Sequence, residues 1–342
     1  MKTGVKILQI ICWSCWMGSM FPLSAQQATV AFYNVENLFD THDDSLKLDD
    51  EFLPYGPRGW TPSRLHAKYQ RLYKVIAGVD PAWQPPALVG LAEVENRAVL
   101  EGLLRHTPLH RKHYQIVHEE SPDTRGIDVA LLYDPAQFQY ISHVSIPVDL
   151  YPLSDRPTRD ILYVKGTVFE GDTLHCFINH WPSRYSGVTH SAALRHRAAA
   201  VLKEQVRTLR LAHPNASVII TGDFNDNPTD PSLLFLCESD DPASSLKNIS
   251  HYDRAGTHKF QDEWNTFDQF IVSPDLLEAG ELQVKEQRAR VYAPSWLLEQ
   301  DIAHLGYRPR RTYEGYQYHG GFSDHLPVYL QLIKKSAQVA EK

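Results

Sequence analysis

The sequence has few cysteines, no internal repeat and no long linker, and each absence narrows the class of protein. Of the four cysteines among 342 residues, Cys12 and Cys15 lie near the N-terminus, and only Cys176 and Cys237 remain further along. Two cysteines allow one disulfide but exclude a disulfide framework. Neither of these two belongs to a Cys-x-x-Cys pair or has a nearby His at ligand spacing, which argues against a zinc site built on them. Because no run of Gly, Ser or Pro divides the chain, we expect one domain from about residue 28 to 336.

The chain also lacks an excess of basic residues. It has 34 Lys and Arg against 41 Asp and Glu, and a net charge of −7. Proteins that hold long nucleic acids usually carry a basic face, because phosphate contacts dominate that affinity. The acidic balance therefore argues against a processive DNA-binding role, whereas clustered carboxylates suit a divalent cation.

The one long apolar run lies at the N-terminus. Two lysines precede the run at 7–21, and small residues at 23–25 follow it. This order predicts that residues 1–25 are a signal peptide cleaved near Ala25, and that the protein is periplasmic or secreted with no membrane span after cleavage. A membrane anchor is the alternative, but the run falls short of about 20 residues and contains Cys, Ser and Gly. Cleavage would leave 32 basic residues against 41 acidic ones.

Hydrophobic periodicity predicts strands in both halves of the chain, accompanied by helices. Apolar residues at helical spacing follow Pro62, and further helices are expected at about 98–106 and 191–211. Short apolar runs bounded by turn residues predict the strands, at 29–33, 86–93, 114–118, 127–133, 141–149, 160–169, 173–179, 218–221, 266–272 and 325–333, with a hairpin turn at 170–172. Residues 39–60 and 279–322 are expected to be irregular. This pattern indicates an α/β or α+β class, with two sheets packed together and helices outside.

The sharpest chemical feature is the segment 221–228. It places Asp223 and Asn225 directly after an apolar strand. A strand end followed by Gly and Pro turns is a rigid place from which to project polar groups. The same residue types also form ordinary β-turns, so this segment alone favours neither interpretation.

A second segment, at 320–328, brings Asp324 and His325 onto the start of an apolar strand. Neighbours on a strand point to opposite faces, so His325 is expected to take its orienting carboxylate from elsewhere. Asp268, at the start of another strand, is the candidate. Its charge would fix the tautomer of His325 and raise its pKa. Asp324 is then free to face a metal or water.

Polar residues stand at three further strand ends. Asn34 and Glu36 follow the first strand, Glu93 follows the second, and His180 follows the strand at 173–179. A single carboxylate at a strand end is usually solvated. Several polar strand ends that converge are rare by chance, so their co-occurrence favours an active site.

Together these motifs resemble the endonuclease/exonuclease/phosphatase superfamily, the fold shared by exonuclease III-like DNA-repair nucleases, DNase I-like nucleases, sphingomyelinases and inositol polyphosphate 5-phosphatases. The match runs in order from Asn34 to Leu330, and the motifs GDFN and SDH at this separation are its specific part. The resemblance implies an α/β fold, a four-layered sandwich of two mixed β-sheets flanked by helices, and a requirement for Mg²⁺ or Mn²⁺.

The resemblance also implies the metal-binding residues. Glu93 matches the main metal-ligand Glu of the family, and Glu36 falls where some members have a second metal-associated acid. Asp324 belongs to the SDH motif and is expected at the metal. Asn34 matches the Asn of the family's first strand and is expected to be catalytic rather than a metal ligand.

The remaining matches are catalytic. His180 corresponds to the strand-end His that contacts the phosphate. Asp223 and Asn225 match the pair that aligns the attacking water and the phosphate oxygens. Asp268 matches the acid that holds the terminal His, His325.

The sequence departs from the family pattern at three places, and these departures bear on the identity of the substrate more than on the chemistry. Ala92 stands where the family often has Gln before the metal Glu, and Gln269 stands where an aromatic usually follows the acid. The Tyr or Arg of the middle loop in repair nucleases has no clear match, and Arg125 is only a weak candidate.

The residue types suit in-line attack of water on a phosphodiester, assisted by a divalent cation. Two substrate classes stay open, namely nucleic acid and smaller phosphoesters such as a phospholipid headgroup or a sugar phosphate. The acidic balance slightly favours the second class, whereas the aromatic segment 292–318 suits either. A non-catalytic binding module on the same fold is a third interpretation. A zinc hydrolase is disfavoured, because no His-x-x-x-His spacing combines with a Glu. We expect a monomer.

Overall fold

The computed structural model describes residues 26–80, 84–169, 171–239, 245–252, 256–278 and 280–334. The expected signal peptide and residue 170 of the expected hairpin turn lie outside the described residues. Within those ranges, no helix combines the length and the apolar character that a membrane span requires.

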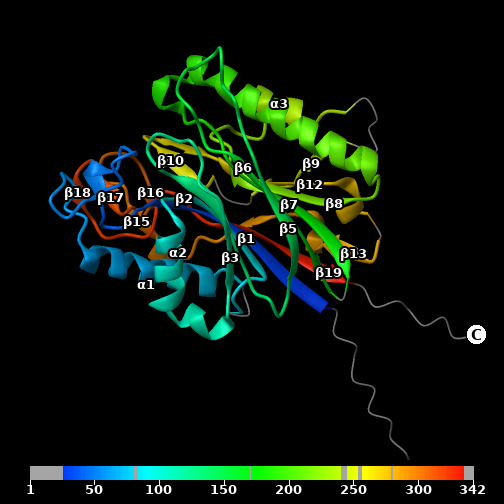
Figure 1. Ribbon diagram of the computed structural model, residues 1–342, viewed down its shortest axis with the longest axis horizontal. Coiled ribbons are helices and arrows are strands. Elements are labelled where there is room, and N and C mark those ends of the chain that lie inside the picture. The colour runs from blue at the N-terminus through cyan, green and yellow to red at the C-terminus, as the bar shows by residue number, and fades with distance from the viewer. Residues whose placement is uncertain are drawn as a thin grey trace, which may run out of the picture.

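Two sheets pack face to face, and helices cover their outer faces (Figure 1). The first sheet has the spatial order β13 (Leu282–Val284), β19 (Val328–Lys334), β1 (Gln26–Leu38), β2 (Leu88–Val94), β4 (Asp128–Tyr133) and β3 (Gln115–His118), with β14 (Arg290–Val291) also paired to β19. The second has the order β5 (Gln139–Ile146), β6 (Ile161–Val168), β7 (Asp172–His180), β8 (Ser217–Asp223), β12 (Asp268–Val272) and β9 (Lys247–Asn248). Both sheets contain parallel and antiparallel pairs, so they are mixed as expected.

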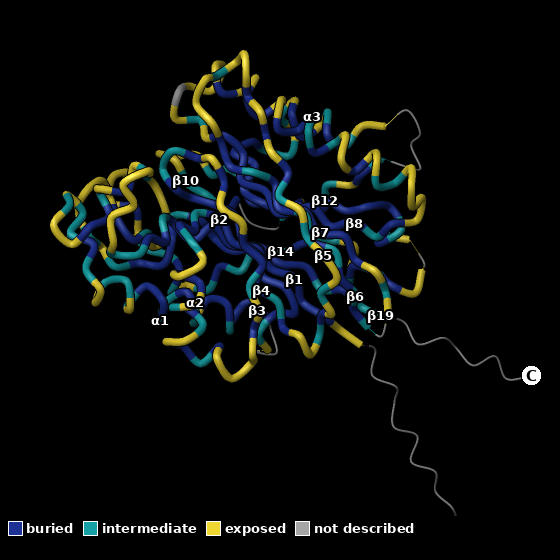
Figure 2. Tube along the Cα trace, viewed as in Figure 1, coloured by how far each residue is buried: buried dark blue, intermediate teal, exposed yellow. Residues whose placement is uncertain are grey.

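Each sheet has its own helical layer. Helices α1 (Pro62–Gly78) and α2 (Arg97–Arg105) pack on the first sheet, and α3 (Val188–Ala212) and α4 (Pro231–Cys237) pack on the second. A third apolar cluster fills the space between the sheets, with side chains such as Phe32, Ile178 and Phe270. Figure 2 shows the strands as the most buried part of the chain. The layers are therefore helix, sheet, sheet and helix, which confirms the predicted four-layered α/β sandwich.

Several elements differ from the predicted ranges. Strand β1 extends well beyond the predicted 29–33, because its second half carries buried polar residues that hide the strand pattern. The predicted irregular segment 279–322 includes strands of two or three residues, too short for a periodic signal. The short strand pairs outside the two sheets are β10 (His258–Phe260) with β11 (Glu263–Asn265), β15 (Leu298–Gln300) with β16 (Tyr307–Pro309), and β17 (Tyr313–Glu314) with β18 (Gln317–Tyr318).

Cys176 and Cys237 are free thiols. Cys176 packs in the core between the sheets, whereas Cys237 packs in the cluster beneath α3 on the other face of the second sheet. The sheet separates the two sulfurs, so the disulfide that the sequence allows does not form.

Gly222 lets β8 approach β7 closely. A Cβ atom at this position would overlap the backbone carbonyl of Asn179. We therefore expect Gly222→Ala to force the two strands apart and to lower the free energy of unfolding by about 1–3 kcal/mol, as overpacking does. Chemical denaturation would measure the loss. Gly280→Ala is the matched control, because its new Cβ would meet nothing closer than 3.8 Å. Equal stability of both variants would contradict this account.

Candidate active site

Three of the predicted site residues lie at neighbouring strand ends of the second sheet. His180 ends β7 and Asp223 ends β8, and the two residues are register partners in the parallel pair. Asp268 begins β12 and is the register partner of Asp223 on the other side. The sheet therefore places two carboxylates and an imidazole side by side at one edge.

Two further residues reach this edge from the first sheet. Asn34, in β1, donates its side-chain amide to Asp223 Oδ2 at 3.0 Å. His325, just before β19, places its Nδ1 2.7 Å from Asp268 Oδ2, the pairing that the sequence predicts. Its Nε2 lies 3.7 Å from Asp223 Oδ2, and His180 Nε2 lies at the same distance from that oxygen. The site thus lies where the two sheets meet, with Asp223 between two imidazoles.

The two imidazoles have opposite protonation tendencies. Burial alone would lower the pKa of His325, but Asp268 and Asp223 outweigh it and raise the pKa well above its ordinary value. Burial, followed by the charge of Arg159, lowers the pKa of His180 well below its ordinary value. His325 is therefore a cation at neutral pH, whereas His180 is neutral. Burial also raises the pKa of Asp223 to about 6, against the opposing charge of His325.

Backbone irregularities aim several of these side chains. The pairing of β1 with β2 shifts between Asn34 and Leu38, and the pairing of β2 with β4 shifts on either side of Glu93. Glu36 and Glu93 have φ of 52° and 62°, and Asn225 has φ of 52°. Such bulges and left-handed residues re-aim side chains, and they cluster at functional sites.

Asn225 is held by its neighbours in the turn after β8. Its backbone N–H donates to Asp223 Oδ1 at 2.9 Å, and its side-chain amide donates to the carbonyl of Trp181 at 3.0 Å. Phe224 is fully buried edge-to-face against Trp181, with ring centroids 4.8 Å apart. An amide group has two N–H donors. Among the described residues, Asn34 and Asn225 each use one of them, so the second N–H of each has no partner there.

Glu36 holds the segment that follows β16. Its two carboxylate oxygens accept hydrogen bonds from the backbone N–H groups of Thr312 and Tyr313, at 2.6 and 3.2 Å. Burial raises the pKa of Glu36 to about 7 and lowers the pKa of nearby Lys68 to about 8. Each oxygen keeps a further lone pair, so the metal role of Glu36 stays a prediction.

Asp324 is paired with a cation, unlike the free carboxylate that the sequence led us to expect. Arg311 Nη2 donates to Asp324 Oδ2 at 2.9 Å. Burial alone would raise the pKa of Asp324, but Arg311 and His325 outweigh it and hold the pKa at about 2. The sequence gives no signal for this partner, because Arg311 lies in a segment without regular spacing. Lys68, the buried cation near Glu36, has a weak sequence signal, because it interrupts the apolar face of α1.

The donors near Glu93 fit a hard divalent cation. Glu93 is half-buried, and its Oε2 accepts the backbone N–H of Asn37 at 2.9 Å, which orients the carboxylate. The other oxygen accepts no hydrogen bond from the described residues. Mg²⁺ keeps several waters and needs only one or two carboxylates from the protein. Glu93 therefore fits the predicted metal ligand.

His325 also belongs to two groups of potential ligand atoms that lie within 4.8 Å of one another. One group contains His258 and Asp324, and the other contains Asp223 and Asp268. A protonated imidazole has no lone pair for a metal, and the pKa of His325 is raised well above its ordinary value. Both groups are therefore better described as residues around a cationic His325, which is hydrogen-bonded to Asp268.

Arg159 supports His180 from behind, and sequence reasoning missed it. This buried guanidinium donates to the backbone carbonyls of His180 and Trp181, at 3.2 and 2.7 Å, and to Asp123 Oδ2 at 3.0 Å. It also lines a hollow of about 560 Å³, which reaches Pro182 and Ser183, just after His180 in the chain. Beside apolar and neutral residues, the lining includes four cationic or aromatic side chains, namely Arg125, Arg156, His190 and Tyr185.

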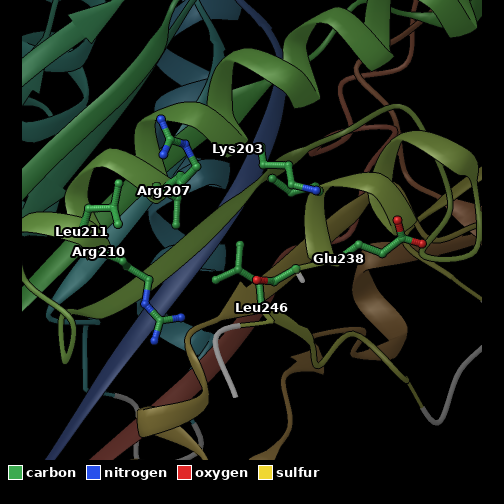
Figure 3. Close-up of a pocket in the computed structure, with 9 residues that line it drawn as sticks. Lys203, Arg207, Arg210, Leu211, Glu238 and Leu246 are labelled. Atoms are coloured by element: carbon green, nitrogen blue, oxygen red, sulfur yellow. The ribbon is translucent and has the colours of Figure 1, made fainter. Parts of the chain in front are cut away.

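A hollow of about 510 Å³ lies elsewhere, between α3 and α4 (Figure 3). Lys203, Arg207 and Arg210 of α3 face it across from Glu238 and Leu246. None of the predicted site residues lines this hollow, so it is separate from the site around Asp223.

Gln269 accounts for one departure from the family pattern. It is fully buried, and its side-chain amide donates to the backbone carbonyls of Asp226 and Thr266, at 2.6 and 2.7 Å. Its Oε1 accepts from the side chain of Asn248 at 2.7 Å. Gln269 therefore ties β12 to the turn after Asp223 and makes no part of a substrate surface.

Comparisons with known proteins agree with this geometry. Among solved structures, the chain is similar to an endonuclease/exonuclease/phosphatase family protein from Bacteroides thetaiotaomicron, at 17% identity over 93% of this chain and 99% of that one, with a TM-score of 0.55. It is also similar to a mannosyl-6-phosphatase from the same species (19% identity, 89% and 99% covered, TM-score 0.54) and to the human Nocturnin catalytic domain with bound sulfate (16% identity, 90% and 95% covered, TM-score 0.53). At these identities the likeness concerns the fold alone. No curated protein matches the sequence. The profile of one family, however, matches residues 29–334, and the chain therefore belongs to the Endonuclease/Exonuclease/phosphatase family, whose members include nucleases and phosphatases.

Proposed function

We propose that this protein is a divalent-metal-dependent phosphoesterase that cleaves phosphodiester bonds by in-line attack of water. One observation carries the proposal. Asp223 Oδ2 lies 3.7 Å from the neutral imidazole of His180 and 3.7 Å from the cationic imidazole of His325. A base and a cation side by side at the strand ends suit a reaction in which water loses a proton and a phosphate gains charge.

The proposed role of each residue follows from its charge and its hydrogen-bond donors. Asp223 orients the water and accepts its proton, and a pKa of about 6 keeps it ionised and basic at neutral pH. The cationic ring of His325 donates to a phosphate oxygen, a contribution of about 3–4 kcal/mol for one well-placed donor. His180 and the second N–H groups of Asn34 and Asn225 donate to the remaining oxygens. Asp268 positions His325 and keeps it protonated.

Glu93 would hold the divalent cation, with Glu36 and Asp324 as proposed further ligands. Mg²⁺ or Mn²⁺ suits these oxygen donors. When bound, the ion polarises a phosphoryl oxygen and offsets charge on the leaving oxygen.

The hollow beside His180 supports an anionic substrate larger than a phosphate group. Arg125 and Arg156 line it, and its acid Asp123 is already paired with Arg159. Tyr185 is 99% exposed at this hollow and offers a flat apolar face to a base, a sugar or a lipid headgroup. Rates on plasmid DNA, RNA, bis-p-nitrophenyl phosphate and p-nitrophenyl phosphate, measured side by side, would distinguish a nuclease from a phosphatase of small esters. No turnover of any of them would favour a binding module.

The apolar N-terminal run supports a periplasmic or secreted enzyme. N-terminal sequencing of the protein recovered from a periplasmic or culture fraction would then begin near Gln26.

Asp223→Asn should lower kcat on bis-p-nitrophenyl phosphate by roughly 10²–10⁴-fold, the usual contribution of a general base. The amide keeps the shape and one acceptor oxygen, so circular dichroism and the melting temperature should change little. Asp275→Asn is the matched control, because Asp275 contacts Ser217 at the opposite end of β8. Unchanged turnover in Asp223→Asn would contradict the assignment of Asp223 as the general base.

Removal of metal with a chelator should abolish turnover, and Mg²⁺ should restore it. Glu93→Gln should raise the Mg²⁺ concentration for half-maximal rate by roughly tenfold or more, since loss of a supporting group alone costs that much. Glu101→Gln, an exposed acid on α2 paired with Arg97, serves as the control. A Mg²⁺ requirement that is equal in both variants would exclude Glu93 as a ligand.

Asp268→Asn should lower the pKa of His325, because Asp268 is the largest influence that raises it while burial acts in the opposite direction. The alkaline limb of the activity profile should then move to lower pH. NMR titration of the His325 ring in the metal-free protein would measure the shift. The same titration in Asp275→Asn should match the unmodified protein. A His325 titration that Asp268→Asn leaves unmoved would contradict the pairing.

A further inference from the structure

A third group of potential ligand atoms, in addition to the two that contain His325, lies outside the site around Asp223. His118 ends β3, Asp128 begins β4, and Glu120 lies in the segment that connects these strands. One ligand atom from each residue lies within 4.8 Å of the others. None of the three residues takes part in the chemistry described above.

Two atoms of this group are buried without a hydrogen-bond partner in the part of the chain that the structure describes. They are His118 Nε2 and Asp128 Oδ2, on side chains that are 2% and 1% exposed. The atoms face each other at 3.3 Å, in a geometry that makes no hydrogen bond. A buried polar atom left in this way costs about 1–3 kcal/mol, so a third atom between them would be stabilising.

The spacing suits a metal ion. Two ligands that are each about 2.0–2.1 Å from a tetrahedral Zn²⁺ lie roughly 3.3 Å apart. Asp128 also has the support that a ligand needs, because its Oδ1 accepts the backbone N–H of Ser121 at 2.9 Å.

Glu120 gives the group an excess of negative charge and an opening to solvent. Its side chain is exposed, whereas those of His118 and Asp128 are buried. The amino group of Lys47, the nearby cation, donates instead to the backbone carbonyls of Ser121 and Asp123, at 3.0 and 3.2 Å. Within the described ranges, therefore, no cationic side chain donates a hydrogen bond to the two carboxylates or to the imidazole.

We propose that His118, Glu120 and Asp128 bind one transition-metal cation of the Zn²⁺ class, with water in the fourth position. The imidazole nitrogen favours such an ion over Mg²⁺, which takes oxygen ligands. The site is separate from Glu93, although it lies one strand away, since Asp128 pairs with Val94.

The bound ion would fix the segment 119–127 against the first sheet. That segment carries Asp123, which pairs with Arg159 behind His180, and Arg125, which lines the hollow beside the site. The role we assign to the ion is therefore structural, and it holds one wall of the substrate hollow in place.

Zn²⁺ binding to the metal-stripped full chain, measured by equilibrium dialysis in excess Mg²⁺, tests the proposal. The unmodified protein should retain one tightly bound Zn²⁺, which should also raise the melting temperature. Glu120→Gln should weaken this binding by about tenfold or more. Because the side chain of Glu120 is exposed, this variant should keep the fold, and circular dichroism would verify that.

Two controls locate the ion. Glu119→Gln alters the adjacent acid, which pairs with His143 instead, and should bind Zn²⁺ as the unmodified protein does. Glu93→Gln should also keep the bound Zn²⁺, whatever its effect on hydrolysis. The proposal is wrong if no Zn²⁺ is retained, if Glu119→Gln and Glu120→Gln weaken binding equally, or if Glu93→Gln abolishes it. The first result would leave His118 and Asp128 as a simple ion pair.

Discussion

Asp223 and Asp268 lie in the second sheet, but the groups that hold their charges come from the first. Asn34 donates to Asp223, and His325 pairs with Asp268. Both carboxylates are at most 2% exposed, and a buried charge without partners costs several kcal/mol. The inter-sheet core and the site therefore depend on each other. A shift of one sheet along the other would leave two buried carboxylates unpaired, so the packing of Phe32, Ile178 and their neighbours also sets the geometry of the chemistry.

The same edge concentrates backbone strain. A left-handed residue other than glycine costs about 1–3 kcal/mol, and Glu36 and Glu93 both adopt this conformation. Surrounding hydrogen bonds offset part of the cost. Glu36 is held by two backbone N–H groups, and Glu93 accepts the N–H of Asn37. At these two positions the irregular backbone aims a carboxylate, while the inter-sheet core behind them is built mainly from strands.

Sequence reasoning predicted the parts of the fold and site that local patterns encode. The strand ends at His180 and Asp223 follow apolar runs, and the alternation of side chains along a strand was enough to favour Asp268 over Asp324 as the partner of His325. Sequence reasoning failed where charged residues from distant segments form ion pairs. Arg311 comes from an irregular segment, and nothing local distinguishes it from a solvated surface arginine, yet it pairs with Asp324. The length of β1 was underestimated for a related reason, because its buried polar residues are stabilised only by distant partners.

The cations of the site distinguish two kinds of carboxylate. Three acids form a close ion pair, namely Asp268 with His325, Asp324 with Arg311, and Asp123 with Arg159. Asp223 only shares His325 with Asp268, and Glu93 has no ion-pair partner among the described residues. A carboxylate without a close cation gains most from a positive charge that arrives with a metal ion or develops in the reaction, because no neighbouring charge has already stabilised its negative form. The proposed chemistry needs a base and a metal ligand, and it needs them at these two positions. The paired acids are then the ones that hold strands, loops and cations in place around them.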